Sequence, residues 1–235
     1  TTGPCKQDSL SGSITVTADA TINWVASSGD TSQSLCNNSS ITPIQILVGG
    51  SGTGALISAG GLPAGLTTSY AGGIFTISGA PSVAGLFHYT VSTTGPCVNP
   101  FLTGTIEVYP LPDAAFTYST PSCATGIISF TDASIPNLGL LAGWQWDFGD
   151  PGSGPLNSST LQYPVHVFSN PGVYNVSLTV TTDHNCTSNP PAIVPVTIYP
   201  RPKAGFIIPE VCLNDTYAQF IDTSSVGAPS TIISW

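Results

Sequence analysis

Six cysteines are the residues with the widest chemical repertoire, since a thiol can bind a metal, act as a nucleophile or form a disulfide. They are Cys5, Cys36, Cys97, Cys123, Cys186 and Cys212. None forms a C-x-x-C pair, the spacing typical of zinc ligands, so the pattern argues against a zinc site. Widely spaced cysteines are typical of disulfides in an oxidising, extracellular setting. Free buried thiols are the alternative interpretation.

Carboxylates form a second candidate site, at Asp147 and Asp150 with Asp132 and Asn157 nearby in the sequence. Several converging oxygens can hold Ca²⁺, and paired carboxylates can do acid–base catalysis. Aspartates in turns, however, commonly accept hydrogen bonds from nearby backbone N–H groups. We therefore expect Asp147 and Asp150 to cap turns, with calcium binding as the second interpretation and no cofactor.

Nucleophile–base chemistry has no recognisable motif in the sequence. His88, His166 and His184 lie in separate segments, and neither G-x-S-x-G nor H-E-x-x-H occurs. Exposed Trp and Tyr side chains can stack on sugars, but Trp144 and Trp146 are more typical of a hydrophobic core. The sequence therefore predicts no enzymatic activity.

Charge excludes two classes of partner. Lys and Arg number only 3 against 12 Asp and Glu, which gives a net charge of −9. Phosphate backbones and anionic membrane surfaces both require basic side chains, so we expect no binding to nucleic acid or to such membranes. We also expect no direct membrane insertion, because the most apolar region, residues 41–66, is interrupted by Gly49, Gly50, Gly52, Gly54, Gly60, Gly61 and Pro63.

Two kinds of internal repeat organise the chain. Residues 1–16 (TTGPCKQDSLSGSITV) align without a gap on residues 93–108 (TTGPCVNPFLTGTIEV), and YPLPDAAF at 109–116 aligns on YPRPKAGF at 199–206. FTDAS at 130–134 likewise aligns on FIDTS at 220–224. We therefore expect a terminal hairpin of an incomplete repeat at 1–16, complete repeats at 18–109 and 112–199, and the first part of another at 201–235.

Short alternating apolar runs separated by turn residues make up each complete repeat. Phe87, Tyr89 and Val91 alternate with polar residues, as do Tyr174, Val176, Leu178 and Val180, which predicts strands with one buried face. The segment Ala71-Gly72-Gly73 predicts a tight hairpin turn. About 90 residues with six or seven strands indicates an all-β fold of tandem immunoglobulin-like β-sandwich repeats.

The repeat at 112–199 resembles a PKD domain. The resemblance rests on a W-x-F-G-D-like motif and, about twenty residues later, on a G-x-Y-x-V-x-L-x-V strand that includes Tyr174. The motif comprises Trp144, Gln145, Trp146, Asp147, Phe148, Gly149 and Asp150. The chain departs from the family at Pro151, where Gly is usual, and we expect this to alter the turn only. The resemblance implies that the tryptophans fill the core between the sheets and that Gly149 permits a sharp turn.

The repeat at 18–109 is similar to immunoglobulin-like repeats of giant cell-surface proteins of Bacteroidota. The similarity rests on the segments GLPAGL (61–66), GIFTISGAP (73–81) and GLFHYTV (85–91). Alternation of such repeats with PKD domains resembles gliding-motility adhesins exported by the type IX secretion system.

The repeat register suggests a pairing for the cysteines. Cys36 and Cys97 hold positions in the first complete repeat that are similar to those of Cys123 and Cys186 in the second, so we predict the disulfides Cys36–Cys97 and Cys123–Cys186. Cys5 and Cys212 then belong to the incomplete repeats.

Together these patterns predict a structural stalk or spacer of an extracellular, cell-surface adhesin or filament. Its expected partners are neighbouring repeats of the same chain, together with surface glycans or other cell-surface proteins. Two alternatives stay open, namely accessory domains of a secreted hydrolase and a filament subunit assembled by strand exchange.

Overall fold

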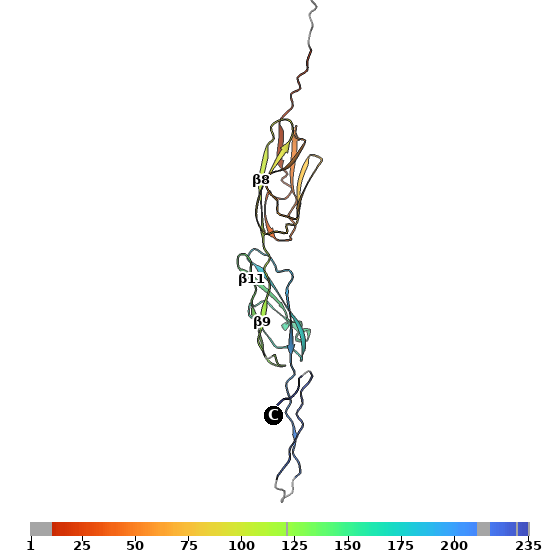
Figure 1. The fold of residues 1–235 in the computed structure, drawn as a ribbon, viewed down its shortest axis with the longest axis vertical. Coiled ribbons are helices and arrows are strands. Elements are labelled where there is room, and N and C mark those ends of the chain that lie inside the picture. Colours follow the sequence, from red (N-terminus) through yellow and green to blue (C-terminus); the bar gives the residue numbers. More distant parts are fainter. Residues whose placement is uncertain (1–10, 121, 211–216, 229, 235) are drawn as a thin grey trace, which may run out of the picture. The chain divides into compact units, whose positions relative to one another are not determined.

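The computed structural model describes residues 11–120, 122–210, 217–228 and 230–234. The chain divides into two compact units, Thr1–Tyr109 and Pro110–Trp235, coloured red to green and green to blue in Figure 1. The described residues are almost entirely β-strand and loop, which confirms the all-β prediction. No helix in the described part of the chain is long and apolar enough to cross a membrane.

Eight strands form the first unit, in two four-stranded sheets. The sheet orders are β1-β3-β6-β5 and β2-β8-β7-β4. The strands are β1 (Ala20–Trp24), β2 (Ser32–Cys36), β3 (Ile44–Gly50), β4 (Gly54–Gly60), β5 (Leu66–Ala71), β6 (Ile74–Gly79), β7 (Gly85–Thr94) and β8 (Phe101–Tyr109). The predicted tight turn joins β5 to β6: Ala71 pairs with Ile74, and Gly72 and Gly73 both have positive φ. Two positive φ angles are what a two-residue hairpin loop requires.

The core of the first unit lies between these two sheets. Strand β7 shows the predicted alternation, because Tyr89, Val91 and Thr93 are buried while the residues between them are not. The inner face of the other sheet contributes the fully buried Ile44, Ile46 and Ile77. The buried hydroxyl of Tyr89 donates to the Thr31 carbonyl at 2.7 Å, so this polar group inside the core is satisfied.

Strand β2 was not predicted, because its sequence SQSLC lacks an apolar alternation. It pairs in parallel with β8, from Ser32 opposite Thr105 to Cys36 opposite Tyr109. Most of the side chains of β2 are partly exposed. Such an edge strand depends on its backbone hydrogen bonds more than on burial, so hydrophobic periodicity does not reveal it.

The second unit is also a sandwich of two sheets. One has the order β13-β10-β9 and the other β12-β11-β14-β15. The elements are β9 (Phe116–Tyr118), β10 (Ile128–Asp132), β11 (Leu141–Asp147), the 3-10 helix η1 (Pro151–Asn157), β12 (Ser158–Ser159), β13 (Val165–His166), β14 (Gly172–Thr182) and β15 (Ala192–Ile198). As predicted, β14 buries Val176, Leu178 and Val180 on one face.

Residues after Tyr199 begin to repeat the second unit. Strand β16 (Phe206–Ile207) pairs with β17 (Ile221–Asp222) so that Phe206 lies opposite Asp222, just as Phe116 lies opposite Asp132 in β9 and β10. Ser224 N donates to Asp222 Oδ1 at 2.9 Å, which reproduces the bond from Ser134 N to Asp132. The β16–β17 pair therefore reproduces the local pairing of β9 with β10.

The predicted hairpin at 1–16 falls mostly outside the described residues. Residues 11–16 lie within them and form no strand, and Ile14 and Val16 are exposed. The hairpin therefore stays a prediction.

Candidate functional site

The W-x-W-x-F segment occupies β11 and the residue after it. Trp146 and Phe148 are buried, whereas Gln145 and Asp147 point outward, because successive side chains of a strand face opposite sides. This confirms the prediction that Trp146 and Phe148 belong to the core. Trp144 is half-buried at the edge of the same core.

An aromatic cluster surrounds Trp146. Its ring centroid lies 5.0 Å from that of Phe116 and 5.6 Å from that of Phe130, and Phe148 is stacked against it at 6.4 Å. The indole Nε1 donates to the Leu161 carbonyl at 2.8 Å. The cluster joins the two sheets, so its role is to hold the sandwich together.

Gly149 makes the turn that follows β11. Its φ is +66°, and a side chain there would place Cβ 2.8 Å from the carbonyl oxygen of Asn175. Glycine is therefore required both by conformation and by space. The departure at Pro151 starts the 3-10 helix η1, where proline at the first position costs no hydrogen bond.

Asp150 is the polar centre of the second unit and is only 1% exposed. Its carboxylate accepts hydrogen bonds from Ser169 N at 2.8 Å, from Ser169 Oγ, and from His166 Nε2 at 3.2 Å. Burial raises the pKa of Asp150, but the Ser169 and His166 hydrogen bonds outweigh it and hold the pKa below its ordinary value. The ionised carboxylate thus ties the loop after β13 to the turn after β11.

His166 lies between Asp150 and the aromatic core. Its ring stacks on Phe148 with centroids 4.3 Å apart and planes 7° apart, and its edge contacts Phe168 at 4.6 Å. His166 is buried. Its pairing with Asp150 was not predicted. The sequence offered one signal for the packing of His166. It lies two residues before Phe168, so in an extended segment both side chains point to the same face.

The Ser169, Asp150 and His166 side chains do not form a nucleophile–base relay. In such a relay, histidine stands between serine and carboxylate so that it can take the serine proton. Here the carboxylate stands between the other two, and the serine donates to it. Asp150 and His166 are also buried, so the geometry is that of a structural hydrogen-bond network.

Asp147 does cap the turn, as predicted, because its Oδ1 accepts from Gly149 N at 2.9 Å. Asn157 Nδ2 donates to the same oxygen at 3.0 Å. Asp150 differs from the prediction, since its carboxylate reaches Ser169 and not the backbone of its own turn.

Asp132 has hydrogen-bond partners that differ from those of Asp147 and Asp150. It accepts from Trp144 Nε1 at 2.8 Å and from Gln162 Nε2 at 3.1 Å. Burial raises the pKa of Asp132, but hydrogen bonds led by those of Ser134 lower it overall. Within the described ranges, no three His, Cys, Asp or Glu residues gather as metal ligands do. Calcium binding stays untested.

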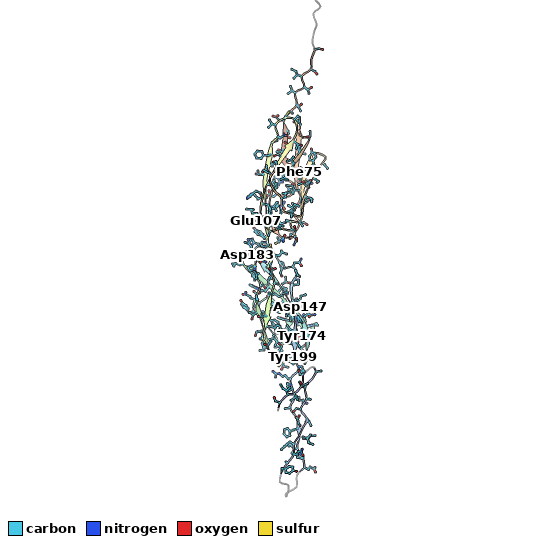
Figure 2. All side chains as sticks on the ribbon, in the orientation of Figure 1. Phe75, Glu107, Asp147, Tyr174, Asp183 and Tyr199 are labelled. Atoms are coloured by element: carbon cyan, nitrogen blue, oxygen red, sulfur yellow. The ribbon has the colours of Figure 1, made fainter. Side chains whose placement is uncertain are left out.

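Tyr174 lies at the rim of the core, where its ring packs 4.4 Å from that of Phe168. Its hydroxyl donates to the Asn170 carbonyl at 2.8 Å, which closes the turn before β14. The residue thus anchors a loop. Figure 2 labels Tyr174 and Asp147 in this part of the second unit.

The cysteine pairing predicted from the sequence is wrong. Cys97 and Cys123 have free thiols, whereas Cys36 and Cys186 are disulfide-bonded. Neither Cys36–Cys97 nor Cys123–Cys186 can therefore be a bond of this structure. Cys5 and Cys212 lie outside the described residues.

Distance explains the error in the first unit. Cys36 lies opposite Tyr109, the last residue of β8, whereas Cys97 lies in the loop before Phe101, the first. Nine residues of strand separate the two ends by about 27 Å. A disulfide requires Cα atoms within about 7 Å.

Distance also rules out the predicted Cys123–Cys186 bond in the second unit. Cys123 pairs with Tyr199 after β15, whereas the backbone of Cys186 is bonded to Thr182 at the far end of β14. Strand β14 has eleven residues, so these ends lie about 34 Å apart. In Figure 2, Asp183 and Tyr199 mark the two opposite ends of this unit.

A shallow hollow of about 320 Å³ adjoins His166 and Phe148. Its lining is mostly apolar and includes the exposed Ile127, Leu156 and Val165. Its polar lining residues are Ser158, Ser159 and His166, of which His166 is already bonded to Asp150.

Comparisons with known proteins agree with this picture of the second unit. Residues 110–198 match the model of the PKD domain family. Among solved structures, the PKD1 domain of Vibrio anguillarum Epp is 27% identical over 37% of this chain and 93% of that one, with a TM-score of 0.32. The PKD1 domain of the Vibrio cholerae metalloprotease PrtV is 23% identical over 37% and 96%, also with a TM-score of 0.32.

A three-domain fragment of titin covers 77% of this chain and 67% of its own length, at 11% identity and a TM-score of 0.43. No curated protein matches the chain. Residues 110–198 are thus similar to a PKD domain, and the chain is a series of immunoglobulin-like β-sandwich units. Domains of this kind are typically non-catalytic parts of extracellular proteins.

Proposed function

We propose that this chain is a structural spacer in the stalk of a large bacterial cell-surface protein, such as an adhesin used in attachment or gliding motility. Export by the type IX system belongs to this proposal, because the immunoglobulin-like repeat resembles repeats of proteins that use it. The partners of the segment are then the neighbouring repeats of the same chain, and any glycan or surface protein is bound elsewhere.

The observation that carries the proposal is the immediate succession of self-contained sandwiches. Each unit has its own buried core, and the local fold of the second begins again after Tyr199. Tyr109 O is still hydrogen-bonded in the first unit and Leu111 O already in the second, so only Pro110 lies between these two bonded residues. Short proline-containing linkers are stiff spacers.

Polar groups of the second unit also support a structural role. Asp150 and His166 are buried there and bond to each other, and Ser169 at the surface donates a further hydrogen bond to the Asp150 carboxylate. With only 3 Lys and Arg, the sequence also offers few sites to trypsin-like proteases. Both properties suit a segment that must persist outside the cell.

Domain replacement in the intact surface protein tests the proposal. Residues 18–199 are deleted in one strain and replaced in another by two unrelated immunoglobulin-like domains of the same length. We expect the deletion to reduce attachment or gliding and the replacement to restore it, because a spacer contributes length and not specific side chains.

The matched control restores residues 18–199 themselves at the same junctions. If the replacement fails while this control succeeds, and both proteins reach the surface in equal amounts, the segment contributes specific contacts and the spacer proposal is wrong.

A further inference from the structure

Each unit carries one cysteine beside the tyrosine that ends its last strand. Cys36 lies opposite Tyr109, and Asn37 N donates to Tyr109 O at 2.8 Å. Cys123 bridges Tyr199, and Ala124 N donates to Tyr199 O at 2.7 Å. The two cysteines are structurally equivalent, and we call them the exit cysteines because the chain leaves each unit at this tyrosine.

A second cysteine of each unit lies in the loop between its last two strands, and we call Cys97 and Cys186 the hairpin cysteines. The hairpin cysteine lies where the chain enters the unit. Cys97 Sγ is 3.7 Å from the carbonyl oxygen of Thr17, on the segment that leads into β1.

The second unit shows the same placement of its hairpin cysteine. Asn137 binds the Leu111 carbonyl at the entry of the chain, and nearby Asp183 N donates to Leu140 O close to Cys186. The exit and hairpin cysteines of one unit therefore lie at its two opposite ends.

Each unit has one disulfide-bonded cysteine and one free cysteine, but the bonded position differs between the two units. Exit Cys36 and hairpin Cys186 are disulfide-bonded, whereas exit Cys123 and hairpin Cys97 are free. Each free thiol thus occupies a position whose equivalent in the other unit forms a disulfide. The other described cysteine of its own unit is about 27 Å or more away, so a bond inside the unit is excluded.

We propose that Cys97 and Cys123 form disulfides with cysteines of other immunoglobulin-like repeats, an exit cysteine always bonding a hairpin cysteine. In a tandem array the exit of one repeat is followed by the entry of the next, which pairs these two classes by connectivity. Cys97 then takes the exit cysteine of a preceding repeat, and Cys123 takes the hairpin cysteine of a following one.

Formation of each bond removes two thiol protons and two electrons. The acceptor is a protein or small-molecule disulfide, which is reduced to two thiols by thiol–disulfide exchange as the new S–S bond forms. Both free cysteines are partly exposed, so such an oxidant can reach them. The oxidising surroundings rest on the proposed extracellular location.

Two fusion proteins test the two bonds, with residues 18–199 as the parent. Residues 1–16 align on 93–108, so residues 18–109 can be placed directly before residues 18–199 to supply a preceding repeat. The YPLP and YPRP segments also align, so residues 110–199 can be repeated after residue 199 to supply a following one. The leftover thiol of each added copy is removed, by Cys97→Ser in the first fusion and Cys123→Ser in the second.

Each protein is refolded with oxidised glutathione, denatured without reduction, alkylated and weighed by mass spectrometry, which also detects any attached glutathione. We expect two alkylated thiols in the parent and one in each fusion. The control for the first fusion adds Cys36→Ser to the preceding copy, and the control for the second adds Cys186→Ser to the following copy. We expect two alkylated thiols in each control.

Two thiols in a fusion, or one thiol in both a fusion and its control, would overturn the proposed pairing. This readout does not depend on attachment or gliding, so its failure is distinguishable from failure of the spacer proposal.

Discussion

Truncation of Trp146 to Ala should strongly destabilise the second unit. The side chain is fully buried, and a buried tryptophan removes roughly 200 Å² from water. At about 25 cal/mol per Å² this burial is worth about 5 kcal/mol, an upper estimate because the unfolded chain is partly compact.

The hydrogen bond to Leu161 adds little to this figure. Leu161 is 65% exposed, so water can replace the indole as the donor to its carbonyl. The cavity left among Phe116, Phe130 and Phe148 cannot close easily, because these rings come from different strands. We therefore expect a loss of about 4 kcal/mol, within the usual range of about 3–5 kcal/mol for such truncations.

Denaturation with guanidinium, followed by tryptophan fluorescence in a Trp24→Phe background, measures this loss because the signal then comes from the second unit. Trp146→Phe keeps most of the aromatic packing and should lose less, about 1–2 kcal/mol. A loss below about 1 kcal/mol for Trp146→Ala, with an unchanged denaturant slope, would refute the assignment of Trp146 as the central core residue.

Three further predictions follow from backbone strain and from titrating groups. Gly149→Ala should destabilise the second unit by about 2 kcal/mol in denaturant titrations, and by more than Gly72→Ala destabilises the first unit, since Gly72 has a similar positive φ but open space around Cβ. Because the pKa of Asp150 is lowered in the fold, the second unit should lose stability as the pH falls below 3.8, and Asp150→Asn should be less stable at neutral pH and lose less stability over this acid range in thermal melts, the remaining loss coming in part from Asp132. Burial, with a smaller contribution from Asp30, raises the pKa of Tyr89 to about 12, so the first unit should lose stability between pH 10 and 12. Tyr89→Phe should remove that alkaline loss, and an unchanged pH profile of the melting temperature would contradict the assignment.

The sequence by itself determined the class of fold and most of the core. Alternation in β7 and β14 reflects the two-residue period of a strand, so it identified Tyr89, Val91, Val176 and Leu178 as inward-facing without any knowledge of their partners. Gly72 and Gly73 predicted a hairpin because a two-residue hairpin loop requires two positive φ angles, which glycine adopts readily. The alignment of FTDAS on FIDTS agrees with the matching pairs β9–β10 and β16–β17, since aligned residues make the same short-range bonds.

Tertiary structure alone decided the features that depend on distance across a unit. Sequence alignment showed that Cys36 resembles Cys123 and that Cys97 resembles Cys186, but it contains no information about which end of a strand each one occupies. The strands between them span about 27–34 Å, so equivalent placement did not mean proximity. The contact of His166 with Asp150 and Phe148 could not be predicted either, because it joins strand β13 of one sheet to the turn after β11 of the other. Local patterns are set by backbone periodicity, whereas such pairings arise only when the two sheets pack together.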